Sequence, residues 1–333
     1  MKNEYYSTIN LLILKSLPGI GNKRAAAIFE ENVDFLSKNI VSENSLNNNF
    51  FINSVNKLHE VGGNVESLQR KAEQIIEISN NSDIKIINYR SSKYPKELKH
   101  LSTKPVLLHV KGSLDSLTSS TKVAVVGTRN PSPFSKKYTE RAVRIISSEG
   151  FTVVSGLAVG IDSIAHKSAI ECAGQTIAVL AHGLDQPVYP KENSSLASLI
   201  LESGGALISE YPIGEKLNVR NLVARDEWQS GVSSGVFAVE SSLSGGTRHA
   251  VRNSIKQGRV LGMLNHIEHN KFIGFDKFHS NDQLISLNMK MIYENKAVSI
   301  YSKKSLLNYL EDCRQLSIRL NFNDGIADES TLF

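Results

Sequence analysis

The sequence predicts an α/β fold built on a doubly wound, mostly parallel sheet, and three observations carry that prediction. Short, uninterrupted apolar runs recur from Lys122 onwards, segments with helical spacing separate them, and small or polar residues follow each run. Parallel strands covered by helices on both faces are buried on both sides, so they consist of continuous apolar residues.

The strands expected in this region are Val123–Val126, Thr152–Val154, Thr176–Leu180, Ala206–Ile208, Val236–Val239 and Val260–Met263. The helices expected between and after them are Ser135–Ser148, Ile161–Cys172, Glu192–Glu202, Asn218–Gln229 and Gly246–Gln257. One more strand, Ala297–Tyr301, and one more helix, Lys303–Leu310, are expected to follow.

The chain divides into three parts. Apolar residues at helical spacing predict a helical domain over 1–79, with helices in Ile9–Leu17, Ala25–Phe29, Phe50–Leu58 and Val65–Ile78. Strands at Ile84–Ile87 and Val106–Val110 lead into the sheet domain, expected over 80–313. Residues 314–333 are expected to form a loose, polar tail.

Composition excludes several classes of protein. The 333 residues are 41% hydrophobic and 21% charged, as in an ordinary globular chain. No apolar run reaches the roughly 18 residues of a membrane helix, and no secretory cleavage pattern is visible. Two distant cysteines, Cys172 and Cys313, leave no disulfide framework or cysteine-rich zinc site, so a reducing cytoplasm is expected. The net charge of +5 is compatible with a polyanionic partner.

Polar and small residues follow five consecutive strands, at the sheet edge where ligands of parallel sheets bind. The residues that we expect to line a phosphate site there are Gly127, Thr128, Arg129, Ser155, Gly156, Lys191, Asn193, Ser209, Ser244, Gly245, Gly246 and Thr247. Small residues at a helix start expose backbone N–H groups to an anion, and Arg129 and Lys191 would supply the charge.

Each of these residues also has a purely structural interpretation. The glycines could merely permit tight turns, and Arg129 could pair with Glu240 and hold its loop. The fingerprints of a nicotinamide cofactor, a P-loop and a hydrolase nucleophile elbow are all missing, so no cofactor is expected.

The histidines give weaker signals. Asp162 and His166 are four residues apart on one expected helix and could form a catalytic couple or a simple hydrogen bond across one turn. His266, His269 and His279 have no partner pattern for a metal, and none is expected. Trp228 is expected to pack in a helix.

The amino-terminal region contains Leu17-Pro18-Gly19-Ile20-Gly21-Asn22-Lys23-Arg24 between two expected helices, a helix-hairpin-helix pattern. Such a hairpin can aim backbone N–H groups at a DNA phosphate, or it can serve as a structural corner. Gly19, Gly21 and Lys23 are therefore candidate auxiliary DNA contacts.

Together these motifs resemble the DNA-processing protein A (DprA/Smf) family. The matching segments are Tyr94–Leu98, Lys104–Gly112, Val123–Arg129, Val153–His166, Thr176–Leu180, Val188–Asn193, Ser209–Pro212 and Ser244–Thr247. The run from Ser155 to His166 is the most specific of them, and the likeness covers roughly residues 84–312.

The resemblance implies an extended Rossmann-like fold and a non-enzymatic function. A family member would bind and protect single-stranded DNA, load the RecA recombinase onto it in natural transformation or recombination, and act as a homodimer. It would use Arg129 and Lys191 on the DNA backbone, with Arg225 among the residues of the surrounding pocket.

Two departures from the family pattern are visible. The family commonly has Phe-Pro-x-Arg-Asn-Arg-Ile-Ile where this chain has Leu222 to Gln229, so Arg225 is kept but Glu227 replaces a basic residue. Residues 313–333 are too few for the winged-helix domain with which many members end. A specialised role, for example in phage defence, is an alternative to transformation.

Two other functions share the expected pocket. A phosphoribohydrolase-like enzyme would need a glutamate where this chain has Ala250, which argues against that reading. A sensor that binds a small nucleotide in the same loops remains open.

Overall fold

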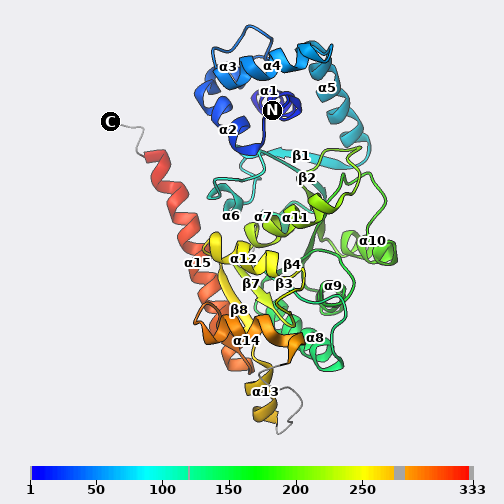
Figure 1. The fold of residues 1–333 in the computed structure, drawn as a ribbon, viewed down its shortest axis with the longest axis vertical. Helices are drawn as coiled ribbons and strands as arrows, with labels where there is room; N and C mark the ends of the chain where they lie inside the picture. The colour runs from blue at the N-terminus through cyan, green and yellow to red at the C-terminus, as the bar shows by residue number, and fades with distance from the viewer. Residues whose placement is uncertain (1, 119–120, 274–281, 330–333) are drawn as a thin grey trace.

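A single sheet of nine strands forms the centre of the molecule in this computed structural model (Figure 1). The structure describes residues 2–118, 121–273 and 282–329. The strands are β1 (Ile84–Asn88), β2 (Leu107–Gly112), β3 (Lys122–Val126), β4 (Thr152–Ser155), β5 (Thr176–Val179), β6 (Ala206–Ser209), β7 (Gly235–Ala238), β8 (Val260–Leu264) and β9 (Val298–Ile300). Every expected strand is present, with ends shifted by one or two residues.

The sheet has the order β1-β2-β6-β5-β4-β3-β7-β8-β9. The seven strands from β6 to β9 are parallel, whereas β2 runs antiparallel to both β1 and β6. The chain runs outward from β3 through β4, β5 and β6, and then returns to place β7 on the other side of β3. The point where strand order reverses therefore lies between β3 and β7, and the predicted doubly wound α/β fold is confirmed.

Helices cover both faces of the parallel part. One face packs against α8 (Pro133–Ser148), α9 (Ile161–Glu171) and α15 (Lys303–Glu329). The other face packs against α11 (Val219–Gly231), α12 (Arg248–Lys256) and α14 (Ser286–Tyr293). Alternate residues of β3 pack into the cores on the two faces of the sheet, because neighbouring side chains of a strand point to opposite faces.

Shorter elements complete this region: α6 (Lys96–Lys99), α7 (Asp115–Thr118), the 3-10 turns η1 (Lys191–Asn193) and η2 (Gln283–Ile285), α10 (Ser194–Glu202) and α13 (His266–Ile273). No helix in the described ranges is long and apolar enough to cross a bilayer.

The amino-terminal part consists of α1 (Lys2–Ser16), α2 (Asn22–Glu31), α3 (Val33–Leu36), α4 (Asn49–Glu60) and α5 (Val65–Asn81), drawn in blue at one end of Figure 1. Its apolar core is continuous with that of the sheet, since Ile9 and Phe29 belong to the same buried cluster as Val110 and Trp228. The helical segment 1–79 thus shares its core with the segment 80–313.

The carboxyl-terminal expectation needs correction. Residues 314–329 are not a loose tail, because α15 continues to Glu329. Tyr309, Cys313 and Ser317 are buried at a spacing of four residues, and the guanidinium of Arg314 lies 5.1 Å from the ring centre of Phe151. The polar composition of this stretch obscured that buried stripe.

Candidate nucleic-acid interface

A large cavity lies at the carboxyl edge of the sheet, where strand order reverses. This central cavity has a volume of about 470 Å³. Its walls come from the loop after β3 (Gly127 to Arg129), from α9 and α11, and from the loop between β7 and α12 (Gly245 to Thr247). It has the position at which doubly wound sheets bind ligands, and its size is within the usual range of ligand pockets.

Arg129 lies where the central cavity meets two other hollows. A side pocket of about 60 Å³ is lined by Arg129 together with His182, Tyr189 and Pro190. A third hollow, of about 420 Å³, is lined by Arg129, Lys136 and the start of α9. Arg129 is exposed, and within the described ranges its side chain makes no hydrogen bond or ion pair. Its charge is therefore available to a ligand.

Glu240 does not pair with Arg129. Its buried carboxylate accepts hydrogen bonds from the hydroxyl of Ser132 at 2.6 Å and from the backbone N–H of the same residue. The Glu240 backbone oxygen accepts from the N–H of Thr128 at 2.8 Å. This carboxylate fixes the loop after β3 without using the arginine.

Lys191 lies in η1, beyond the side pocket. Its side chain is exposed, and it does not line any of these three hollows, although the neighbouring Tyr189 and Pro190 do. The structure thus places Lys191 on the same edge of the sheet as Arg129, but outside the cavity walls.

Three of the expected site residues have buried side chains that hold loops together. Ser155 donates to the Val125 oxygen at 2.7 Å, and Asn193 donates to the Leu157 oxygen at 2.8 Å. Ser209 donates to the His182 oxygen at 2.8 Å. These side chains act on the backbone behind the surface, which sequence reasoning could not distinguish from contact with a ligand.

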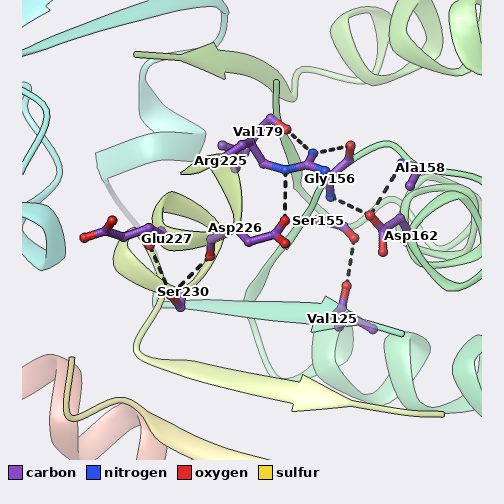
Figure 2. A network of polar contacts seen from close by, with 10 residues as sticks. All are labelled: Val125, Ser155, Gly156, Ala158, Asp162, Val179, Arg225, Asp226, Glu227 and Ser230. Carbon is purple, nitrogen blue, oxygen red and sulfur yellow. Dashed lines mark hydrogen bonds and ion pairs between the residues drawn. The ribbon is translucent and has the colours of Figure 1, made fainter. Parts of the chain in front are cut away.

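Arg225 is the centre of a polar network around the loop after β4 (Figure 2). Its Nη1 donates to the backbone oxygens of Gly156 at 2.5 Å and Val179 at 2.6 Å, and its Nε lies 3.3 Å from Asp226 Oδ1. Only 6% of Arg225 is exposed. Arg225 therefore ties two strand ends together, and it also lines the side pocket and the central cavity, as the family resemblance implied.

Asp162 occupies the anion position at the start of α9. Its Oδ2 accepts hydrogen bonds from the backbone N–H groups of Gly156 at 3.1 Å and Ala158 at 3.4 Å. Burial raises the pKa of Asp162 to about 6, against the opposing charge of Arg225. A Cβ at position 156 would lie 2.3 Å from Arg225 Nη1, so this close approach requires glycine. The N–H of Gly156, expected to bind phosphate, is thus already satisfied.

The loop between β7 and α12 is the more open anion site. The backbone N–H groups of Gly246 and Thr247 have no hydrogen-bond acceptor in the described part of the chain, and both residues line the central cavity. They come directly before α12, whose dipole favours an anion there. Gly127, Thr128 and Gly245 also line the cavity, whereas Ser244 is exposed and does not.

Sequence reasoning missed Asn288, which supports this loop from α14. Its buried Nδ2 donates to the oxygens of Val239 and Leu264 at 3.0 Å, and its Oδ1 accepts from the hydroxyl of Ser241 at 2.5 Å. The backbone N–H of Leu243 donates to Ser286 Oγ at 3.1 Å. The segment before β9 contains no recognisable motif, and the burial of Asn288 cannot be read from the sequence.

The amino-terminal hairpin docks on the same edge of the sheet. Asn22 Nδ2 donates to Glu210 Oε2 at 3.1 Å, and Trp228 Nε1 donates to Glu210 Oε1 at 2.7 Å. Gly19 has a φ of 78°, and its oxygen accepts from Arg24 Nη1 at 2.7 Å. Lys23 is exposed beside Gly21 and remains a candidate contact.

Asp162 and His166 do not form a couple. His166 Nδ1 lies 2.7 Å from Thr176 Oγ1, while the Asp162 carboxylate faces the loop after β4. His266 is buried against Ser135 and the Leu264 oxygen, and His279 lies outside the described residues. No metal-binding cluster of three acidic, histidine or cysteine side chains occurs in the described ranges.

The buried imidazole of His166 predicts a loss of stability in acid. Burial lowers its pKa from 6.5 to about 3, so below pH 6.5 the unfolded chain binds a proton that the folded chain excludes. The free energy of unfolding should fall as the pH falls from 6.5 towards 3. Asp162 acts in the opposite sense. Because its pKa is raised, the folded chain holds the carboxyl proton more tightly than the unfolded chain does, and the stability that this proton gives is lost as the pH rises from 3.8 through 6. Urea unfolding at pH 7 and pH 5 should show a smaller acid loss for His166→Gln than for the wild type; equal losses would contradict this.

Comparison with known proteins identifies the family. The model of the family described as DNA recombination-mediator protein A matches residues 85–297. Protein Smf of Escherichia coli is 38% identical over 171 residues, which cover 51% of this chain and 45% of that protein. DNA processing protein DprA of Bacillus subtilis is 32% identical over 197 residues, 59% of this chain and 66% of that protein. The chain thus spans about half to two thirds of the length of these two relatives.

Solved structures agree with the fold. DNA processing protein A of Streptococcus pneumoniae superposes with a TM-score of 0.67 at 25% identity, covering 92% of this chain and 97% of that one. DNA processing protein A of Helicobacter pylori superposes with a TM-score of 0.58 at 24% identity, covering 69% and 96%. Since the family model matches well over half of the residues, this chain belongs to the DNA recombination-mediator protein A family.

Proposed function

We propose that the chain binds single-stranded DNA along the carboxyl edge of the sheet, with Arg129 and Lys191 as backbone contacts. The observation that carries this proposal is the exposed guanidinium of Arg129, which has no ion-pair partner among the described residues and borders three adjoining hollows. A guanidinium that is not hydrogen-bonded to a carboxylate can bind a phosphate with two parallel hydrogen bonds.

The surrounding residues favour a backbone contact that does not depend on base identity. The donors at this edge are the N–H groups of Gly246 and Thr247 with the charges of Arg129 and Lys191, all suited to phosphate. The Helicobacter pylori relative is described as having a unique single-stranded DNA binding mode, which supports the choice of ligand.

The acidic replacement at Glu227 does not oppose this interface. Its Oε1 accepts from Thr103 Oγ1 at 2.5 Å, and Figure 2 shows the side chain directed away from Arg225 and Asp162. Glu227 does not line the central cavity. The departure from the family pattern therefore adds no carboxylate to the lining of the proposed phosphate site.

The isolated chain is expected to bind a single strand at least tenfold more tightly than a blunt duplex of the same length. A flexible strand can bring successive phosphates to the separate donors of the sheet edge, whereas a rigid duplex cannot follow them. Fluorescence anisotropy with labelled oligo-dT, mixed-sequence strands and their duplexes, over a salt series, makes the measurement. Equal affinity for the duplex would overturn the proposal.

We further propose that the bound strand is protected and handed to RecA, in the cytoplasm and by a homodimer of this chain. The family description as a recombination mediator supports this partner. With single strands precoated by a single-strand-binding protein, the chain should shorten the lag before RecA begins to hydrolyse ATP. An unchanged lag would refute the loading step but not the DNA binding, which the anisotropy experiment measures separately.

A further inference from the structure

The central cavity contains hydrogen-bond acceptors as well as donors, and one acceptor, Asp162, lies across β3 from the donors. Gly246 and Thr247 follow β7, on one side of β3. Asp162 lines the cavity beside the loop after β4, on the other side, and Asp226 of α11 lies near Asp162 and within electrostatic reach of Arg129 and of His249 on α12 (Figure 2). β4 and β7 are two strand spacings apart, roughly 10 Å. The cavity can therefore hold a ligand with an anionic end and a hydroxyl-bearing end.

Asp162 retains an unused acceptor towards this cavity. It is 6% exposed, and its Oδ2 takes the two backbone N–H groups of the loop after β4. Its Oδ1 accepts no hydrogen bond within the described part of the chain. An ionised carboxylate offers about four lone-pair sites, so Oδ1 remains able to accept from a hydroxyl or amino group.

Asp226 adds a second carboxylate to the same wall. One of its oxygens lies 3.3 Å from Arg225 Nε, and its side chain is 17% exposed. Arg225 cannot offer Nη1 to a bound phosphate, because Nη1 is engaged by two backbone oxygens. Even with the positive charge of Arg225 between them, two ionised carboxylates leave this wall with an excess of negative charge, so it suits neutral hydrogen-bond donors better than phosphates.

We propose that the central cavity binds a ribonucleotide, a ligand distinct from the DNA strand. Its phosphate lies on the N–H groups of Gly246 and Thr247 and beside Arg129, and its ribose hydroxyls donate to Asp226 and Asp162. An acidic side chain that accepts from a ribose 2′-hydroxyl is a general solution for nucleotides in doubly wound folds. DNA lacks the 2′-hydroxyl, so these carboxylates distinguish the two ligands. Because Arg129 borders both sites, nucleotide and DNA should compete.

The test uses the full chain and calorimetric titration with AMP, GMP, CMP and UMP, each beside its 2′-deoxy counterpart. At least one ribonucleotide should bind fivefold or more tightly than its deoxy form. Asp226→Asn, which keeps the shape but removes the charge, should abolish that preference and weaken ribonucleotide binding at least fivefold. The matched control is Asp312→Asn, at an exposed carboxylate on α15, and it should bind like the wild type. Melting curves of both variants establish that they are folded.

Three results would overturn the proposal: no binding of any ribonucleotide at millimolar concentration, equal affinity for ribo and deoxy forms, or an Asp226→Asn variant that binds like the wild type. Anisotropy with labelled oligo-dT on the same samples, without nucleotide, reports the DNA interface independently. Asp226→Asn should bind that strand at least as tightly as the wild type, since it removes a negative charge near Arg129. Failure of the nucleotide site is thus distinguishable from failure of the proposed function.

Discussion

The Arg129→Ala variant is expected to bind single-stranded DNA roughly tenfold to hundredfold more weakly than the wild type, because hydrogen bonds to charged groups contribute about 1.5–3 kcal/mol. Loss of one phosphate contact on a single strand should also lower the slope of log affinity against log salt by about 0.7. The exposed side chain has no ion pair in the described ranges, so the melting temperature should not change. Salt-dependent anisotropy and thermal melting measure both quantities.

Three further variants sharpen this experiment. Arg129→Lys should recover part of the affinity, since an ammonium keeps the charge but not the paired hydrogen bonds. Lys191→Ala should lower the salt slope by a similar amount, and Lys23→Ala, at the auxiliary hairpin, by less. If neither Arg129→Ala nor Lys191→Ala changed the slope, the assignment of both residues as phosphate contacts would fail.

Glu97→Ala should destabilise the folded chain by about 3–5 kcal/mol, the usual cost of removing one partner of a buried ion pair. The Lys122 ammonium at the start of β3 lies 2.9 Å from Glu97 Oε1, and these side chains are only 1% and 7% exposed. Without the glutamate, the charges of Lys122 and of the nearby buried Arg259 would both lose this carboxylate. Urea unfolding at neutral pH gives the free energy directly.

The control for this prediction is Glu171→Ala. Glu171 pairs with Arg144 at 3.5 Å, and both side chains are 60% exposed, so its loss should cost at most about 1 kcal/mol. A second variant, Glu97→Leu with Lys122→Met, replaces the pair by apolar groups and should recover part of the stability, since the buried Arg259 still loses the Glu97 carboxylate. A loss for Glu97→Ala no larger than that for Glu171→Ala would show that the buried pair does not stabilise the fold.

The strands were predictable because each one is buried on both faces. In β3, β5 and β7 a short, mostly apolar run between helical segments favours a covered parallel strand. The helices α14 and α15 were harder to predict. Asn288 and Cys313 are buried in these helices, and hydrophobicity does not identify a small or polar side chain as part of the core.

The location of the candidate site was predictable, but the role of each residue was not. A polar residue at a strand end can hydrogen-bond either to a ligand or to neighbouring backbone groups, and the residue type alone does not tell which of these it does. Ser155 and Ser209 turned out to hold strand ends, whereas Arg129 and Thr247 border a cavity. The sequence also could not reveal that the N–H group of Gly156 donates a hydrogen bond to Asp162, because that contact depends on the path of the loop.

The hydrogen bond between Trp228 and Glu210 makes the intrinsic fluorescence of the tryptophan sensitive to this part of the structure. The chain has one tryptophan, and its indole N–H donates to the same carboxylate that receives Asn22 of the amino-terminal hairpin. The emission of that indole therefore originates at the seam between the helical segment and the sheet, close to the strand ends that bear the cavity. Separation of the hairpin from the sheet, or a shift of α11, would change the polarity around this chromophore. Such movements can be followed in solution without attaching a dye.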